Sequence, residues 1–173
     1  MASPFGQFNI DAFKANFKNA ARNYLFYVKL DVPSASTSQS DQIFLVRSSV
    51  VPSKSIEKKD LGWQGYKLPF GGTTTHEDWT CTFLMDPSAS LYKDMIKWSN
   101  MVHDPKTNVH GMPADYMKTV DIQLLHPDGK SSILDVKLIG AWPVSVAQID
   151  LNYDNTDVVT FQCTFAYVRH EVS

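Results

Sequence analysis

The chain has 173 residues and a formal net charge of −2 at pH 7. This length allows one domain with a substantial core. Hydrophobic residues make up 43% of the chain and charged residues 20%, which excludes wholesale disorder. The lack of a basic excess argues against a protein that grips nucleic acid, although it permits a surface past which DNA slides without sticking.

The N-terminal residues have the spacing of a short amphipathic helix, for which Asn9 is a suitable N-cap. We therefore predict an N-terminal helical extension over residues 1–21. It lacks the continuous apolar stretch of a signal peptide, and no run approaches the roughly 18–20 apolar residues of a membrane span. We expect no membrane partner. The apolar positions of the predicted helix are Ile10, Phe13, Phe17 and Ala20.

Two aromatic and β-branched segments follow, and they predict strands over residues 23–32 and 42–51. Residues 33–41, PSASTSQSD, predict a polar loop between them. We expect these two strands to form an antiparallel pair with a long connection.

Residues 52–75 combine a charged run with glycines and aromatic side chains, and apolar residues alternate only weakly there. A stretch this long with little regular structure is usually functional or disordered. Its aromatic content argues against disorder, and an exposed segment with such an apolar load normally docks on something. The alternative that it folds back on its own domain stays open.

The next elements are a strand over His76–Met85 and a helix that opens at Asp86-Pro87-Ser88. Residues 103–116 predict a loop by their Pro, Gly and Asn content. The strand presents Glu77, Trp79, Cys81, Phe83 and Met85 on one face, and the helix buries Leu91, Met95, Trp98 and Val102.

Strands are predicted over Lys118–Leu125 and Ser131–Ile139, joined by a hairpin turn at residues 126–130. Gly140 and Pro143 then predict a bend or bulge. A last hairpin is expected from Ala147–Tyr153 and Val158–Val168. The sequence thus predicts one mainly β domain, an antiparallel β-sandwich or barrel of about seven or eight strands with one or two short flanking α-helices.

The sequence contains no GxSxG, HExxH or phosphate-binding loop motif. Cys81 and Cys163 lie in apolar runs and are interpreted as reduced core thiols. His103, His110 and Asp104 share a loop, but their spacing matches no common zinc site. We expect no catalysis, no cofactor and no metal. A hydrolase with an unrecognised site stays a rival.

Three stretches carry a resemblance to a known family. They are HEDWTCTFLMD at residues 76–86, the helix that ends near Trp98, and the C-terminal block 136–171 with its IGAWP core. Together they resemble the small tail tube proteins of contractile-tailed bacteriophages. The resemblance covers most of residues 22–170 in order.

The resemblance implies a β-sandwich or barrel subunit that forms hexameric rings, which stack into a tube. Inner strands would join around a channel through which double-stranded DNA passes without tight binding. A sheath protein would lie outside, and a baseplate and tail terminator at the ends. The protein would be made in the host cytoplasm and reside in the virion tail. The same fold in a contractile bacteriocin or secretion tube is the alternative.

In such a tube we expect residues 52–75 to form an extended inter-subunit arm. Its predicted contact residues are Ile56, Leu61, Trp63, Tyr66, Leu68 and Phe70. Candidates for the lumen-facing side chains are Arg47, Ser49, Asp121 and Gln123. A monomeric carbohydrate-binding β-sandwich is the remaining rival, in which Trp63, Tyr66 and Phe70 would stack on sugar rings.

Overall fold

A computed structural model describes residues 10, 14, 20–154 and 156–173 of the chain. The predicted N-terminal helical extension over residues 1–21 therefore lies mostly outside the described residues. The helices are α2 (Gln39–Phe44), α3 (Ser90–Val102) and α4 (Pro113–Tyr116). The strands are β1 (Phe26–Leu30), β2 (Val46–Ser49), β3 (Lys54–Trp63), β4 (Tyr66–His76), β5 (Trp79–Leu84), β6 (His103–Asp104), β7 (Val109–His110), β8 (Lys118–Leu125), β9 (Ser132–Val146), β10 (Thr160–Ala166) and β11 (Arg169–Val172).

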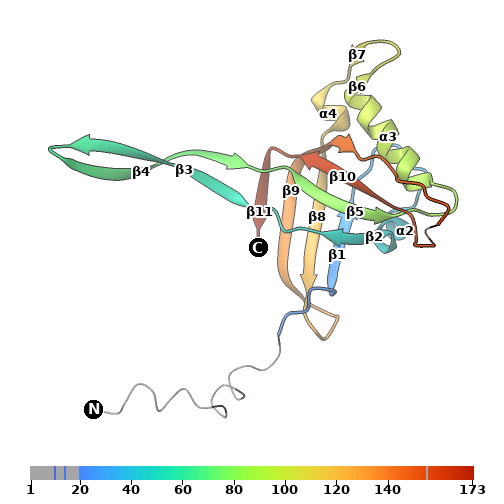
Figure 1. The fold of residues 1–173 in the computed structure, drawn as a ribbon, viewed down its shortest axis with the longest axis horizontal. Coiled ribbons are helices and arrows are strands. Elements are labelled where there is room, and N and C mark those ends of the chain that lie inside the picture. Colours follow the sequence, from blue (N-terminus) through green and yellow to red (C-terminus); the bar gives the residue numbers. More distant parts are fainter. Residues whose placement is uncertain (1–9, 11–13, 15–19, 155) are drawn as a thin grey trace.

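Seven of the described strands form one large antiparallel sheet with the order β1-β8-β9-β10-β5-β2, to which β11 adds at β9, while β3-β4 and β6-β7 form two separate two-stranded sheets. Strand β9 is long enough to take part in both halves of the large sheet. Its first part pairs with β8 and β11, and its last part pairs with β10. We call β1, β8, β11 and the first part of β9 the first half-sheet. The rest of β9 with β10, β5 and β2 is the second half-sheet (Figure 1).

The bend predicted at Gly140 and Pro143 occurs inside the continuous strand β9. Gly140 has a φ of 68°, a value that glycine adopts without steric cost. The pairing of β9 with β10 then shifts register, because Thr164 opposes Ser145 whereas Phe165 opposes Pro143. Val144 is thus the extra residue of a bulge, where a proline can be accommodated in a sheet.

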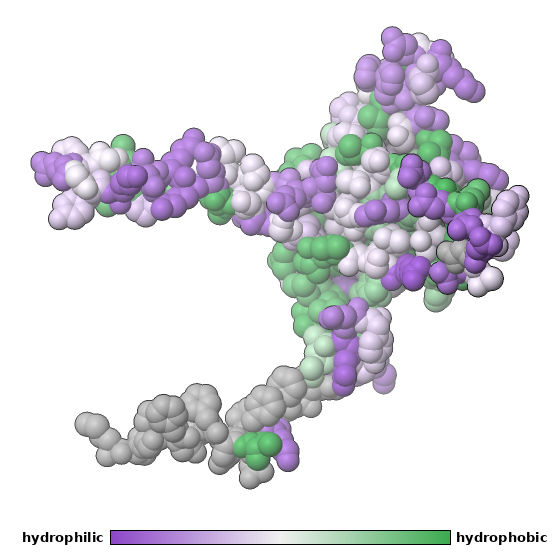
Figure 2. Space-filling view, viewed as in Figure 1, coloured by the Kyte–Doolittle hydropathy of each residue, from purple (hydrophilic) through white to green (hydrophobic). Residues whose placement is uncertain are grey.

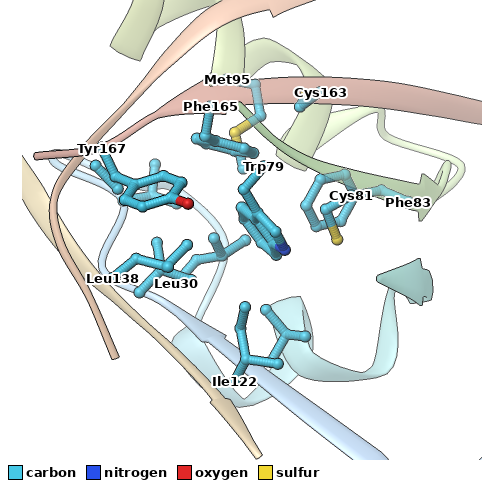
Figure 3. Packing of buried hydrophobic residues seen from close by; sticks show 14 of the residues in the cluster. Leu30, Trp79, Cys81, Phe83, Met95, Ile122, Leu138, Cys163, Phe165 and Tyr167 are labelled. Carbon is cyan, nitrogen blue, oxygen red and sulfur yellow. The ribbon is translucent and has the colours of Figure 1, made fainter. Parts of the chain in front are cut away.

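The core lies between the two half-sheets and under α3. Strand β5 alternates as predicted, with Trp79, Cys81 and Phe83 buried, and α3 buries Leu91, Met95 and Trp98. Figure 3 shows the Trp79 ring packed among side chains from several strands. Each large side chain buried in this way contributes about 1.5–3 kcal/mol of transfer free energy. The predicted mainly β, antiparallel fold class with flanking helices is confirmed.

Both cysteines are free and buried, as expected for core thiols. Burial raises the pKa of the Cys163 thiol to about 12. Burial, together with the neighbouring Cys163, also raises the pKa of Cys81. Both side chains therefore stay protonated and unreactive at neutral pH.

The predicted strand over residues 42–51 is wrong in its first part. Residues Gln39–Phe44 form α2, and only Val46–Ser49 form a strand. The Ser38 hydroxyl accepts a hydrogen bond from the Asp41 N–H and caps the helix, which outweighs the β propensity of the residues that follow. The predicted pairing is also wrong, because β1 pairs with β8 and β2 pairs with β5.

Two further boundaries differ from the predictions. The strand predicted to begin at His76 begins at Trp79, since His76 ends β4. The last hairpin is formed by β9 and β10, while residues 147–153 lie in no strand. The reason is that β9 continues through its bulge instead of ending at Pro143. Strand β8 and helix α3 lie where the sequence placed them.

Candidate assembly surfaces

The segment over residues 52–75 is a long β-hairpin, so the expectation of little regular structure is wrong. Strands β3 and β4 pair from Lys54 opposite His76 to Trp63 opposite Tyr66. Gln64 and Gly65 form the turn, both with positive φ as a two-residue type I′ turn requires. The hairpin projects away from the half-sheets as a separate arm (Figure 1). We call residues 54–76 the arm.

The arm is amphipathic. Residues directly opposite one another in a ladder share a face, and alternate residues along a strand share a face. Lys59, opposite Phe70, lies on one face of the arm, and the register places Leu61, Trp63, Tyr66, Leu68 and Phe70 together on that same face. We call these five residues the arm strip, and their exposed fractions lie between 48% and 77%.

The other face of the arm is polar and carries Lys58, Asp60 and Lys67. Lys58 and Asp60 form an exposed ion pair of 3.3 Å. Ile56 belongs to this second face, where its Cγ2 atom lies beside Gly71. The structure thus brings together five of the six predicted contact residues and separates Ile56 from them. A two-stranded ribbon is marginal on its own, so an arm of this shape calls for a partner surface.

The outer face of the first half-sheet carries the second surface, a row of alternating charges. Lys29 opposes Asp121, Asp121 opposes Lys137, and Lys137 opposes Glu171. Lys137 Nζ lies 3.8 Å from Asp121 Oδ1. We call this row with its neighbours on the same face the charged face.

Two of the predicted lumen-facing residues, Asp121 and Gln123, alternate along β8 and lie on the charged face. The other two, Arg47 and Ser49, lie on β2 at the opposite end of the strand order. Ser49 opposes the buried Cys81 and therefore faces inward. The structure thus does not place the four candidates on one surface.

The histidine loop offers no metal centre. His103 and His110 oppose each other in the small β6–β7 hairpin, with ring centroids 4.5 Å apart. The Asp104 carboxylate accepts hydrogen bonds from the Lys106 N–H and the Thr107 hydroxyl, which bind it into its own turn. Among the described residues, no group of three or more His, Cys, Asp or Glu side chains is arranged to hold a metal ion.

Within the described residues, none of the helices is both long and apolar enough to cross a bilayer.

Sequence reasoning missed the arm's β structure and the charge row. The arm had a readable signal, because Leu61 and Trp63 on one side of Gln64-Gly65 and Tyr66, Leu68 and Phe70 on the other alternate cleanly. The charge row had none, since its four members come from four strands whose register the sequence does not specify.

An antiparallel β subunit with a projecting amphipathic arm and a free charged sheet face belongs to the class of structural assembly proteins. The chain is a member of the phage tail tube protein family, whose model matches residues 7–173. This confirms the resemblance seen in the sequence.

Individual relatives agree. The tail tube protein gp19 of Enterobacteria phage T4 is 26% identical over 125 residues, which cover 71% of this chain and 77% of that protein. The tail tube protein of Serratia phage KSP90 is 27% identical over 154 residues, 86% of each chain.

Solved structures show the same fold. The sheath/tube terminator of the PVC extracellular contractile injection system matches with a TM-score of 0.68 at 15% identity, covering 90% of this chain and 97% of that chain. The sheath-tube complex of the same system matches with a TM-score of 0.58 at 15% identity, over 95% and 97% of the two chains.

Proposed function

We propose that the protein is the structural subunit of a phage tail tube. Its copies form stacked hexameric rings inside a contractile sheath, and the resulting channel conducts the genome during ejection. The observation that carries this proposal is the arm. Five large apolar side chains on one face of a projecting hairpin remain exposed in the single chain, which favours burial against another subunit.

Ring closure follows from the first half-sheet. In the described residues, β1 pairs only with β8 and β11 pairs only with β9, so each has one unpaired edge. Open edges invite pairing with another chain, and head-to-tail pairing closes into a ring when the rotation allows it. Joining these half-sheets between copies would produce one continuous barrel, which removes the edges.

The charged face would line the channel of that barrel. Its row holds two cations and two anions, Lys29 and Lys137 against Asp121 and Glu171, and Asp135 adds a further anion. A wall in which the cations are matched by carboxylates offers DNA phosphates little net attraction, so the genome can slide. Asp121 and Gln123 keep their assignment as lumen candidates.

The arm would reach a subunit in the adjacent ring and hold the stack together. The sheath would surround the tube, with the baseplate and tail terminator at its ends. The protein would be made in the host cytoplasm and end in the virion tail. Tubes of contractile bacteriocins and secretion systems would use the same surfaces, but relatives named as phage tail tube proteins cover 71–86% of this chain and favour the phage.

Imaging of the purified full-length protein tests this function. We expect tubes or hexameric rings by negative-stain electron microscopy. Since Lys54 and His76 are register partners, residues 55–75 can be replaced by an Asn-Gly turn without stretching the body. This variant should remain folded by circular dichroism and fail to polymerise. A Lys58→Ser, Lys67→Ser variant of the polar face is the matched control. A wild-type chain that forms neither rings nor tubes would overturn the proposed function, whereas tubes of normal length from the arm deletion would overturn the arm's role in stacking.

A further inference from the structure

The inner face of the first half-sheet is longer than the second half-sheet that covers it. Three apolar rungs cross β1, β8 and β9 in register. The first rung is almost completely buried, whereas the third is only partly covered. From the buried rung outward, the rungs are Leu30, Val120 and Leu138; then Val28, Ile122 and Val136; then Phe26, Leu124 and Leu134.

The overhang forms an apolar groove of about 320 Å³. Val50 and Val51, which connect β2 to the arm, form one of its sides and are themselves more than half exposed. Figure 2 shows hydrophobic surface gathered on the body next to the root of the arm. None of the described residues that line the groove carries a charged side chain. Its lining residues are Asn23, Phe26, Ser49, Val50, Val51, Ile122, Gln123, Leu124, Leu134 and Val136.

The chain's own arm strip cannot fill this groove. The groove borders the arm's root, and β3 runs for ten residues from that root to the turn. At roughly 3.3 Å per residue, the turn lies about 30 Å away along the ladder. The two strands are hydrogen-bonded along this length and point away from the body (Figure 1). Trp63 at the tip is therefore out of reach of its own groove.

We propose that the groove receives the arm strip of a second copy of this chain. This inference rests on the proposed self-assembly and names the receiving surface. The two surfaces match in chemistry, because both are apolar, both are free of partners among the described residues, and the tip residues Leu61, Trp63 and Leu68 bring no charge into an uncharged groove. Burial of both removes apolar area from water in one contact.

The arrangement also sets the direction of assembly. Each copy carries one arm strip and one groove at different places, so the contact is heterologous and leaves a free arm on one partner and a free groove on the other. Such a contact repeats without limit unless a rotation closes it. This is the property required for the lengthwise growth of a stack.

Disulfide trapping between full-length chains tests the contact. One preparation carries Leu61→Cys in the arm strip and another carries Val51→Cys in the groove. The native Cys81 and Cys163 are buried and do not interfere. We expect a covalent dimer on mild oxidation of the mixture. Asp60→Cys is the matched control, since it lies one residue away on the polar face of the same strand, and its yield with Val51→Cys should be at least tenfold lower.

A substitution in the groove provides the second part of the test. Val51→Asp should leave a folded chain that no longer polymerises, whereas Val144→Asp should polymerise normally. The two valines are 51% and 47% exposed, and Val144 does not line the groove. Equal trapping by Asp60→Cys and Leu61→Cys, or normal polymerisation of Val51→Asp, would overturn the inference.

The test separates this inference from the proposed function. Tubes that form without Leu61–Val51 trapping would reject the groove and leave the tube function standing. Trapping without tubes would reject the tube function and leave the contact standing. Removal of residues 1–19 identifies the competing occupant. If that deletion stops polymerisation while the arm variants do not, the N-terminal segment occupies the groove and the inference is wrong.

Discussion

The body and the arm are both built from strands with one apolar face, but the body buries that face and the arm exposes it. In β5, Trp79, Cys81 and Phe83 alternate and are buried beneath α3 and the opposite half-sheet. In β3 and β4, the arm strip alternates in the same way and is exposed. Alternation specifies a strand with an apolar face, but the partner of that face depends on the rest of the molecule. In the body the partner is intramolecular, and for the arm we propose that it is a second copy.

A matched pair of tryptophan variants gives the largest expected contrast. Trp79 is 1% exposed, packs on Phe165 with ring centroids 5.1 Å apart, and donates a 2.8 Å hydrogen bond to the Val50 carbonyl. Trp79→Ala should lower the free energy of unfolding by about 3–5 kcal/mol. Trp63 is 63% exposed, so Trp63→Ala should change the free energy of unfolding by no more than about 0.5 kcal/mol.

Urea unfolding at a dilution where the chain is monomeric measures both variants, and electron microscopy gives the second readout. Trp63→Ala should abolish or shorten tubes while the monomer keeps its stability. A large loss of monomer stability in Trp63→Ala would mean that the arm strip packs on its own body, and the contrast between the two regions would fail.

A smaller effect on stability is expected at the loop between β1 and α2, which is held by a carboxylate on α3. The Asp94 carboxylate on α3 is 1% exposed and accepts hydrogen bonds from the Ser36 N–H at 2.8 Å and the Thr37 N–H at 3.1 Å. Burial opposes ionisation, but these bonds, the Ser36 hydroxyl and Lys97 outweigh it and hold the pKa of Asp94 below its ordinary value. Asp94→Ala should cost roughly 1.5–3 kcal/mol because charged hydrogen bonds are lost.

The pH dependence of this effect follows from the lowered pKa. Because the folded state holds the proton less tightly than the unfolded state, the stabilisation is present above the unfolded pKa of about 3.9 and is lost as the pH falls toward the folded value. The Asp94→Ala chain should therefore lose less stability than wild type when urea midpoints are compared between pH 6 and pH 3. Parallel pH profiles would show that the carboxylate contributes no charge-dependent stability.

The sequence predicted the parts of the fold that local patterns determine. The burial of β5, the stripe of α3 and the boundaries of β8 follow from spacing within a few residues. The pairing of β1 with β8 and of β2 with β5 could not be predicted, because partners far apart in the chain are chosen by the packing of the whole sheet. All six predicted contact residues lie exposed on the arm, and their role in assembly stays a prediction. The separation of Ile56 from Leu61 follows from alternation along β3, once that segment is recognised as a strand.

The smallest expected effect lies at the junction between the body and the arm. His76 ends β4 and its ring contacts Tyr167 and His170, with centroids 5.5 and 5.1 Å apart. Burial, then the neighbouring His76 and Lys54, lower the pKa of His170. Burial raises the pKa of the neighbouring Tyr167, and the carboxylates of Asp78 and Glu77 raise it further.

Protonation of His170 places a cation beside His76 and Lys54, so the folded state binds this proton less readily than the unfolded chain. Stability should therefore rise with pH across the range just below the ordinary histidine pKa of about 6.5, and fall on acidification. His170→Phe keeps a ring at this position and removes the titration, which should flatten the profile of urea midpoints between pH 7 and pH 5. His110→Phe, on the exposed β7, is the control. An unchanged slope in His170→Phe would show that the junction is held by ring packing alone and that, unlike the Asp94 site of the body, the arm's attachment is insensitive to charge.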